Sequence, residues 1–198
     1  MLNIDVAELK RPIQTLPEYS YCGDATLVID TPDYFFLALF DGAGHGYKAY
    51  TTADLAINFI KDRYSQDLLE LLFSLHEYLK KTPGGVLGLC RVDKETGQLT
   101  YTGIGDVTIR LFHPNSTHLV IRGGILGHGV LHPVLHQLQL WPGNILIMHS
   151  DGVDKQFLPR DFPNFFGQNA SMLARIIIDY CSKILDDASV IILKVNDD

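Results

Sequence analysis

The chain has 198 residues, 46% of them hydrophobic, which predicts one domain spanning residues 1–198 with a sizeable buried core. Its formal net charge of −7 argues against nucleic acid or anionic membranes as partners, because the sequence holds no run of lysine and arginine to neutralise phosphates. No apolar run is long enough to span a bilayer and the N-terminal segment is too acidic for a signal peptide, so we expect a cytoplasmic protein that does not bind membranes. We also expect a monomer.

Apolar segments that alternate or run continuously between turn residues predict mostly strands. In chain order these segments lie at 2–10, 24–30, 34–40, 85–92, 98–103, 106–112, 117–122, 134–140, 144–149 and 188–195. Helical spacing of apolar residues predicts helices at 44–62, 66–80 and 170–182. Few helices among many hairpin-linked strands favour antiparallel sheets with helices packed outside. The segment 152–169, rich in Pro, Phe and Asn without periodicity, is predicted to be a surface flap.

The glycine-rich stretch that follows the strand predicted at 34–40 begins with Asp41 and reads DGAGHG. A dinucleotide-binding loop would need a third glycine where Tyr47 stands. A Walker loop also fails, because no Gly-Lys-Ser or Gly-Lys-Thr follows. Asp41 is therefore a better candidate for the chemistry than the backbone of the turn.

Acidic residues stand where four predicted strands begin or end. They are Asp24 at the start of 24–30, Asp41 at the end of 34–40, Asp151 after 144–149, and Asp186 and Asp187 before 188–195. In antiparallel sheets the end of one strand lies beside the start of the next, so these acids can meet at one edge. A hairpin centred near residues 32 and 33 places Asp24 opposite Asp41. Convergence of the other acids is an assumption about topology.

Carboxylates crowded at one edge repel one another unless a cation is present. Oxygen ligands without a Cys/His set select Mg²⁺ or Mn²⁺ over zinc. Two such ions can share a bridging carboxylate and polarise a water into a hydroxide for in-line attack on phosphorus. The glycine after Asp41 lets the backbone approach, with the Gly42 carbonyl as a further ligand. For any single Asp-Gly pair the alternative is an ordinary turn.

Six short motifs occur in an order that is typical of a known family. They are GD at Gly23-Asp24, DGAGHG at Asp41 to Gly46, GIGDV at Gly103 to Val107, GGILG at Gly123 to Gly127, SDG at Ser150 to Gly152 and DDAS at Asp186 to Ser189. The ordered set resembles the PPM family of metal-dependent Ser/Thr protein phosphatases and, within it, the compact bacterial SpoIIE-like branch. The resemblance covers nearly the whole chain, and the small size is most similar to RsbX-type stressosome phosphatases.

The resemblance implies an α+β fold, a four-layer αββα sandwich of two antiparallel sheets flanked by helices, with a metal centre at one sheet edge. It implies hydrolysis of phosphoserine or phosphothreonine in a bacterial regulatory protein by a metal-bound hydroxide. For an RsbX-like protein the partners would be phosphorylated STAS-domain stressosome proteins. Two alternatives are a catalytically silent module that binds a phosphoprotein and a small-molecule phosphomonoesterase.

The resemblance also implies roles for single residues. Asp41 and Asp151 would be the catalytic carboxylates, and Asp41 would bridge two ions of Mn²⁺ or Mg²⁺. The implied metal ligands are Asp24, Asp41, the Gly42 carbonyl, Asp151 and Asp186, with Asp187 in place of Asp186 if the register differs by one. Asp106 matches a position that in some relatives helps to hold a third ion, the alternative being a hairpin turn residue.

Two positions depart from the family pattern. Many relatives carry a histidine directly after the Asp-Gly pair, where it can protonate the leaving oxygen; here Ala43 stands there and His45 is the candidate general acid. Many relatives also bind the substrate phosphate with an arginine on an early strand. Only Lys10 or Arg11 could match that arginine, and we expect both to be solvated surface charges, with the phosphate held mainly by the metals.

Overall fold

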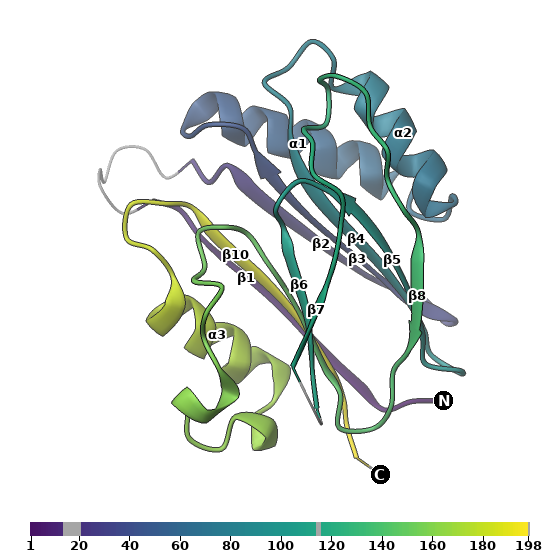
Figure 1. Ribbon diagram of the computed structural model, residues 1–198, viewed down its shortest axis with the longest axis vertical. Helices are drawn as coiled ribbons and strands as arrows, with labels where there is room; N and C mark the ends of the chain where they lie inside the picture. The colour runs from purple at the N-terminus through teal and green to yellow at the C-terminus, as the bar shows by residue number, and fades with distance from the viewer. Residues whose placement is uncertain (14–20, 114–115, 198) are drawn as a thin grey trace.

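The computed structural model describes residues 1–13, 21–113 and 116–197 (Figure 1). Within these residues the strands form two five-stranded antiparallel sheets. Sheet A contains, in spatial order, β1 (Ile4–Arg11), β10 (Ala188–Val195), β9 (Ile145–His149), β6 (Thr108–Phe112) and β7 (Thr117–Leu119). Sheet B contains β2 (Asp24–Asp30), β3 (Tyr34–Gly42), β4 (Gly85–Asp93), β5 (Gln98–Ile104) and β8 (His136–Gln139).

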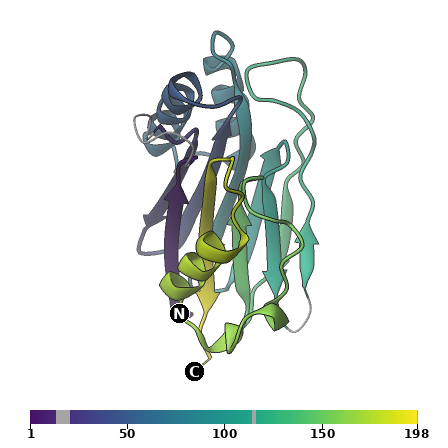
Figure 2. The same cartoon turned by 90° about the vertical axis from the view of Figure 1, so that its left-hand side faces the viewer.

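Helices cover the outer face of each sheet, so the predicted four-layer αββα sandwich is confirmed. The helices α1 (Tyr47–Lys61) and α2 (Leu68–Tyr78) pack on sheet B, and α3 (Ala170–Cys181) packs on sheet A. Figure 2 shows α3 in front of β1 and β10, the two strands with which it makes most of its contacts. In the described part of the chain, no helix has the length and apolar character needed to cross a membrane.

Strand β3 shows why the sheets have two buried faces. Phe36, Ala38 and Phe40 point into the core beneath α1 and α2, whereas their neighbours Leu37 and Leu39 point into the core between the sheets. Successive side chains of a strand point to opposite faces, so a continuous apolar run is buried on both sides. Each sheet is thereby held between two apolar layers.

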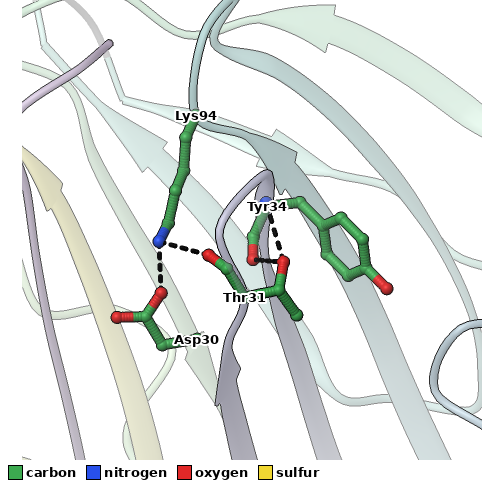
Figure 3. A network of polar contacts seen from close by, with 4 residues as sticks. All are labelled: Asp30, Thr31, Tyr34 and Lys94. Carbon is green, nitrogen blue, oxygen red and sulfur yellow. Dashed lines mark hydrogen bonds and ion pairs between the residues drawn. The ribbon is translucent and has the colours of Figure 1, made fainter.

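The hairpin of β2 and β3 has the predicted register, with Asp24 opposite Asp41. At its other end the turn is tied by side chains (Figure 3). The Thr31 hydroxyl donates to the Tyr34 carbonyl at 2.7 Å and accepts from the Tyr34 amide at 3.0 Å, while the Lys94 ammonium bonds the Asp30 carboxylate and the Thr31 carbonyl. These bonds join the β2–β3 turn to the turn that follows β4.

The segment 152–169 differs from the predicted surface flap. Its backbone forms two short 3-10 turns, Pro159–Asp161 and Phe165–Gly167, and its residues Phe157 and Phe165 are buried against sheet A and α3. The surface prediction is therefore wrong for these aromatic side chains. Turns this short have no periodicity, and burial of a few large rings holds the segment in place.

Candidate metal centre

A cavity of about 260 Å³ opens where the two sheets meet at one end of the molecule. Its walls include the carboxylates of Asp41, Asp106, Asp151 and Asp186, together with Gly42. Asp41 and Gly42 end β3 of sheet B, whereas Asp151 and Asp186 lie between β9 and β10 of sheet A. Because β9 and β10 are antiparallel neighbours, the end of one lies beside the start of the other. The structure thus brings four of the predicted acids to one place.

Asp24 lies opposite Asp41 in the β2–β3 ladder and is not itself a lining residue of the cavity. Its side chain is 1% exposed, and its Oδ2 atom has no hydrogen-bond partner among the described residues. An unpaired buried carboxylate oxygen is costly, because it has lost the solvation of its charge. Asp24 therefore has an unused ligand atom at the place where the sequence predicts a cation.

Burial and neighbouring negative charges raise the pKa of three acids at this site, Asp24, Asp41 and Asp186. Burial, followed by the charges of Asp24, Asp151, Asp106 and Asp186, raises the pKa of Asp41 to about 9. Burial raises the pKa of Asp24 to about 6, although the neighbouring Ser150 and Ser189 hydroxyls oppose this rise. The pKa of Asp186 is also raised, by burial and then by Asp151. Such a cluster favours bound protons or bound cations over free carboxylates.

Asp186 and its neighbour Asp187 face different surroundings. Asp187 is 6% exposed, and its two oxygens accept hydrogen bonds from the Ile13 amide at 2.8 Å and the Gly23 amide at 2.7 Å. Asp186 instead lines the cavity. Of the two acids that the sequence left open, Asp186 is the one placed to contact a ligand in the cavity, and Asp187 joins the start of β10 to the residue before Asp24.

The glycines that follow Asp41 and Asp151 are required by close packing. A Cβ atom at Gly42 would lie 2.7 Å from the Ala49 carbonyl oxygen, and one at Gly152 would lie 1.8 Å from the Asp187 carbonyl oxygen. Only glycine lets the backbone come this close. The backbone after Asp41 therefore packs against α1, and the backbone after Asp151 packs against the residue that precedes β10.

The donor set fits a hard divalent cation. Among the described residues, no three Asp, Glu, His or Cys side chains already stand close enough to enclose one ion. Mg²⁺ needs no such enclosure, since it usually keeps several waters and takes only one or two carboxylates from the protein. The cavity lining offers carboxylate oxygens and a glycine backbone, and the unpaired Asp24 oxygen belongs to the residue opposite Asp41. This set is suited to Mg²⁺ or Mn²⁺.

Other predicted residues lie outside this lining. His45 is exposed in the turn before α1 and does not line the cavity, although its neighbour Gly44 does. Arg11 ends β1 beside Ala188, and its guanidinium donates to the Lys183 carbonyl at 2.5 Å. The sequence did not single out Lys155, whose ammonium lies 3.8 Å from the Asp106 carboxylate. Lys155 lies in the aperiodic segment 152–169, so nothing in the sequence predicts that it lies beside Asp106.

Comparison with known sequences identifies a family. A profile of the family described as Stage II sporulation protein E (SpoIIE) matches residues 31–196. Phosphoserine phosphatase RsbX of Bacillus subtilis (strain 168) is 22% identical over 176 residues, which cover 87% of this chain and 87% of that protein.

Solved structures share the fold over nearly the full chain. A structure described as the bacterial stressosome, a modular system adapted to control secondary messenger signalling, matches with a TM-score of 0.88 and 27% identity, covering 97% of this chain and 100% of that one. The crystal structure of RsbX in complex with magnesium matches with a TM-score of 0.85 and 19% identity, covering 99% of this chain and 100% of that one. At 19% identity, the similarity to the RsbX structure is evidence for a shared fold only.

Proposed function

Because this chain belongs to the SpoIIE family of PPM metal-dependent Ser/Thr phosphatases, we propose that it hydrolyses phosphoserine or phosphothreonine in a partner protein. The observation that supports this most is the meeting of Asp41, Asp151 and Asp186 at one cavity, although they come from different sheets. Among the described residues the lining has four acids and no basic side chain. Because these acids repel one another, their grouping would not stabilise the fold by itself.

The proposed ligands of two Mg²⁺ or Mn²⁺ ions are Asp24, Asp41, the Gly42 carbonyl, Asp151 and Asp186, with Asp106 as a candidate for a third ion. When bound, such ions supply Lewis acidity, which lowers the pKa of a coordinated water and offsets the charge of a phosphoryl group. Asp41 and Asp151 are the proposed catalytic carboxylates. Asp187 holds the Asp186 turn in place through its two backbone hydrogen bonds.

His45 is the proposed general acid. It follows Gly44, a lining residue, and stands between two glycines with positive φ, Gly44 at 89° and Gly46 at 73°. This conformation is open to glycine and strained for other residues, so it sets the direction of the turn that carries His45. An imidazole carried by this turn would act as the general acid that gives a proton to the leaving serine oxygen.

The proposed partners are phosphorylated STAS-domain proteins of a stressosome. In support, one relative is named a phosphoserine phosphatase, and the solved structure at 27% identity is described as the bacterial stressosome. A partner protein also suits the small cavity, which has room for a phosphorylated side chain and leaves the rest of the substrate on the surface.

The test is phosphate release from a phosphorylated STAS-domain protein in the presence of Mn²⁺, compared with release from p-nitrophenyl phosphate. Asp41→Asn and Asp151→Asn should each lower turnover by about a hundredfold or more, because each removes a proposed metal ligand. Asp54→Asn makes the same chemical change on the exposed face of α1 and should retain wild-type turnover.

The outcomes separate the proposal from its alternatives. A wild-type protein that binds Mn²⁺ and the phosphoprotein but releases no phosphate is a silent binding module. Faster turnover of free phosphomonoesters than of any phosphoprotein identifies a small-molecule phosphatase. Unchanged turnover in both cavity variants excludes the two-metal assignment.

A further inference from the structure

The lining of the cavity has carboxylates but no positively charged side chain among the described residues. A phosphoryl group that enters it carries up to two negative charges and meets acids on several sides. Bound metal ions would offset part of this repulsion. The rim beyond them still needs a cation if the phosphoryl oxygens there are to be held.

Lys155 places a cation at this rim. Its Nζ atom lies 3.4 Å from the carbonyl oxygen of Asp106 and 3.8 Å from the Asp106 carboxylate, and Asp106 lines the cavity. Both side chains are about half exposed, at 46% for Lys155 and 56% for Asp106. An exposed ion pair with this geometry contributes little stability, so the ammonium can turn to a stronger acceptor at small cost.

The backbone carbonyl of Lys155 accepts a hydrogen bond from a buried arginine. Arg110 of β6 is 2% exposed, and its guanidinium donates to the Lys155 carbonyl at 3.3 Å and to the Phe157 carbonyl at 2.9 Å. The same group lies 4.5 Å from the ring centre of Phe112 and 4.7 Å from that of Phe157. A rigid, planar donor packed against both rings fixes the two carbonyls, whereas the half-exposed Lys155 ammonium is held only by its contacts with Asp106.

We propose that Lys155 forms an anion subsite for the phosphoryl group at the rim of the cavity, with Arg110 as the residue that positions it. The identity of this anion as a phosphoryl group rests on the proposed function. Lys155 would then supply the phosphate-binding cation that was sought among Lys10 and Arg11. A lysine suits this task because its ammonium is a mobile point charge with three donors.

The test measures binding of inorganic phosphate to the Mg²⁺-loaded full chain by isothermal titration calorimetry. Lys155→Gln should weaken phosphate binding about tenfold, the size expected for one hydrogen bond between charged groups. Lys155→Arg keeps the charge and should bind within about threefold of wild type. Lys80→Gln, which removes an exposed lysine paired with Glu77 on α2, is the matched control and should not change phosphate binding.

Mg²⁺ affinity and the thermal midpoint are measured for every variant. The thermal midpoint should stay unchanged in Lys155→Gln, and Mg²⁺ binding should be no weaker than in wild type, because the variant only removes a cation from beside Asp106. This result distinguishes an anion subsite from a structural role. Equal phosphate affinity in Lys155→Gln and wild type, loss of Mg²⁺ binding in parallel with phosphate, or no phosphate binding by the wild type would overturn the inference. Because the assay needs no turnover, a protein that binds phosphate through Lys155 but releases none from phosphoproteins defeats only the proposed function.

Discussion

Asp187 and Asp186, which directly precede β10, have different roles. Asp187 uses both of its oxygens on backbone amides, one of them on Gly23, which directly precedes Asp24. Asp186 has its side chain at the cavity and a raised pKa caused by burial and by Asp151. The first residue therefore stabilises the fold where the sheets meet, and the second increases the repulsion that a cation would relieve.

Substitution of each aspartate by alanine should separate these roles. Asp187→Ala leaves two amides without acceptors and should lower the free energy of unfolding by about 2–4 kcal/mol, since each buried donor without a partner costs about 1–3 kcal/mol. Asp186→Ala should change it by no more than about 0.5 kcal/mol while weakening Mg²⁺ binding at least about tenfold. Urea unfolding of the metal-free protein and metal titration measure the two quantities. The reverse pattern would make Asp187 the ligand.

The sequence was sufficient to predict the positions of residues that are fixed by short-range geometry. Asp24 and Asp41 could be paired because a short turn sets the register of a hairpin. Whether Asp151 and Asp186 reach the same cavity depends on how sheet A packs on sheet B, and that packing comes from apolar contacts spread over many strands. Arg110 was missed because an arginine within a strand reads as solvent-exposed, whereas here backbone carbonyls and aromatic rings satisfy it.

The β2–β3 hairpin connects a turn at one end of sheet B to the acids at the other. The turn is closed by Thr31, whose hydroxyl both donates to and accepts from the backbone of Tyr34 (Figure 3). Since each one-residue slip moves every side chain to the opposite face, this turn and the two apolar faces of β3 specify the same register. Asp24 reaches its place opposite Asp41 as a consequence of that register.

Thr31→Val keeps the shape of the side chain but removes both hydrogen bonds of the turn. We expect the free energy of unfolding to fall by about 1 kcal/mol, with Mg²⁺ affinity unchanged because the apolar faces still set the register. Thr51→Val, which removes one exposed hydroxyl bond to the Lys48 carbonyl within α1, is the comparison and should cost less. An equal or smaller loss in Thr31→Val would show that the turn does not stabilise the hairpin.

The sequence predicted burial least well for segments whose apolar residues have no regular spacing. The segment 152–169 was predicted to be a surface flap, yet Phe157 and Phe165 join the core between sheet A and α3. Its shape is set by the pocket that receives these rings and by the Arg110 guanidinium, neither of which is local in sequence. The alternating strands and amphipathic helices were predicted correctly in type, because their apolar spacing records the face that each one buries.

At the scale of the whole molecule, the two sheets meet at a cavity whose acids are partly buried and lie close to one another. Asp41 has its pKa raised to about 9 and Asp24 to about 6, against an ordinary value of 3.8. In the metal-free protein the folded state therefore holds more protons than the unfolded state between about pH 4 and pH 9. Stability rises with pH only where the unfolded state binds more protons, so here the contribution of these acids falls as the pH rises.

The thermal midpoint in EDTA should accordingly decrease between pH 5 and pH 8.5, while added Mg²⁺ raises it by an amount that grows with pH as protons stop competing for the ligands. At a Mg²⁺ concentration of about a hundred times Kd the gain is about 2.7 kcal/mol, or roughly 5–10 °C for a chain of this length. Differential scanning calorimetry across this pH range measures both trends. Asp41→Asn is the control, because it removes the acid with the largest shift and should flatten the pH dependence in EDTA and reduce the gain from Mg²⁺. A gain from Mg²⁺ that is equal at pH 5 and pH 8.5 would mean that these carboxylates do not bind the ion.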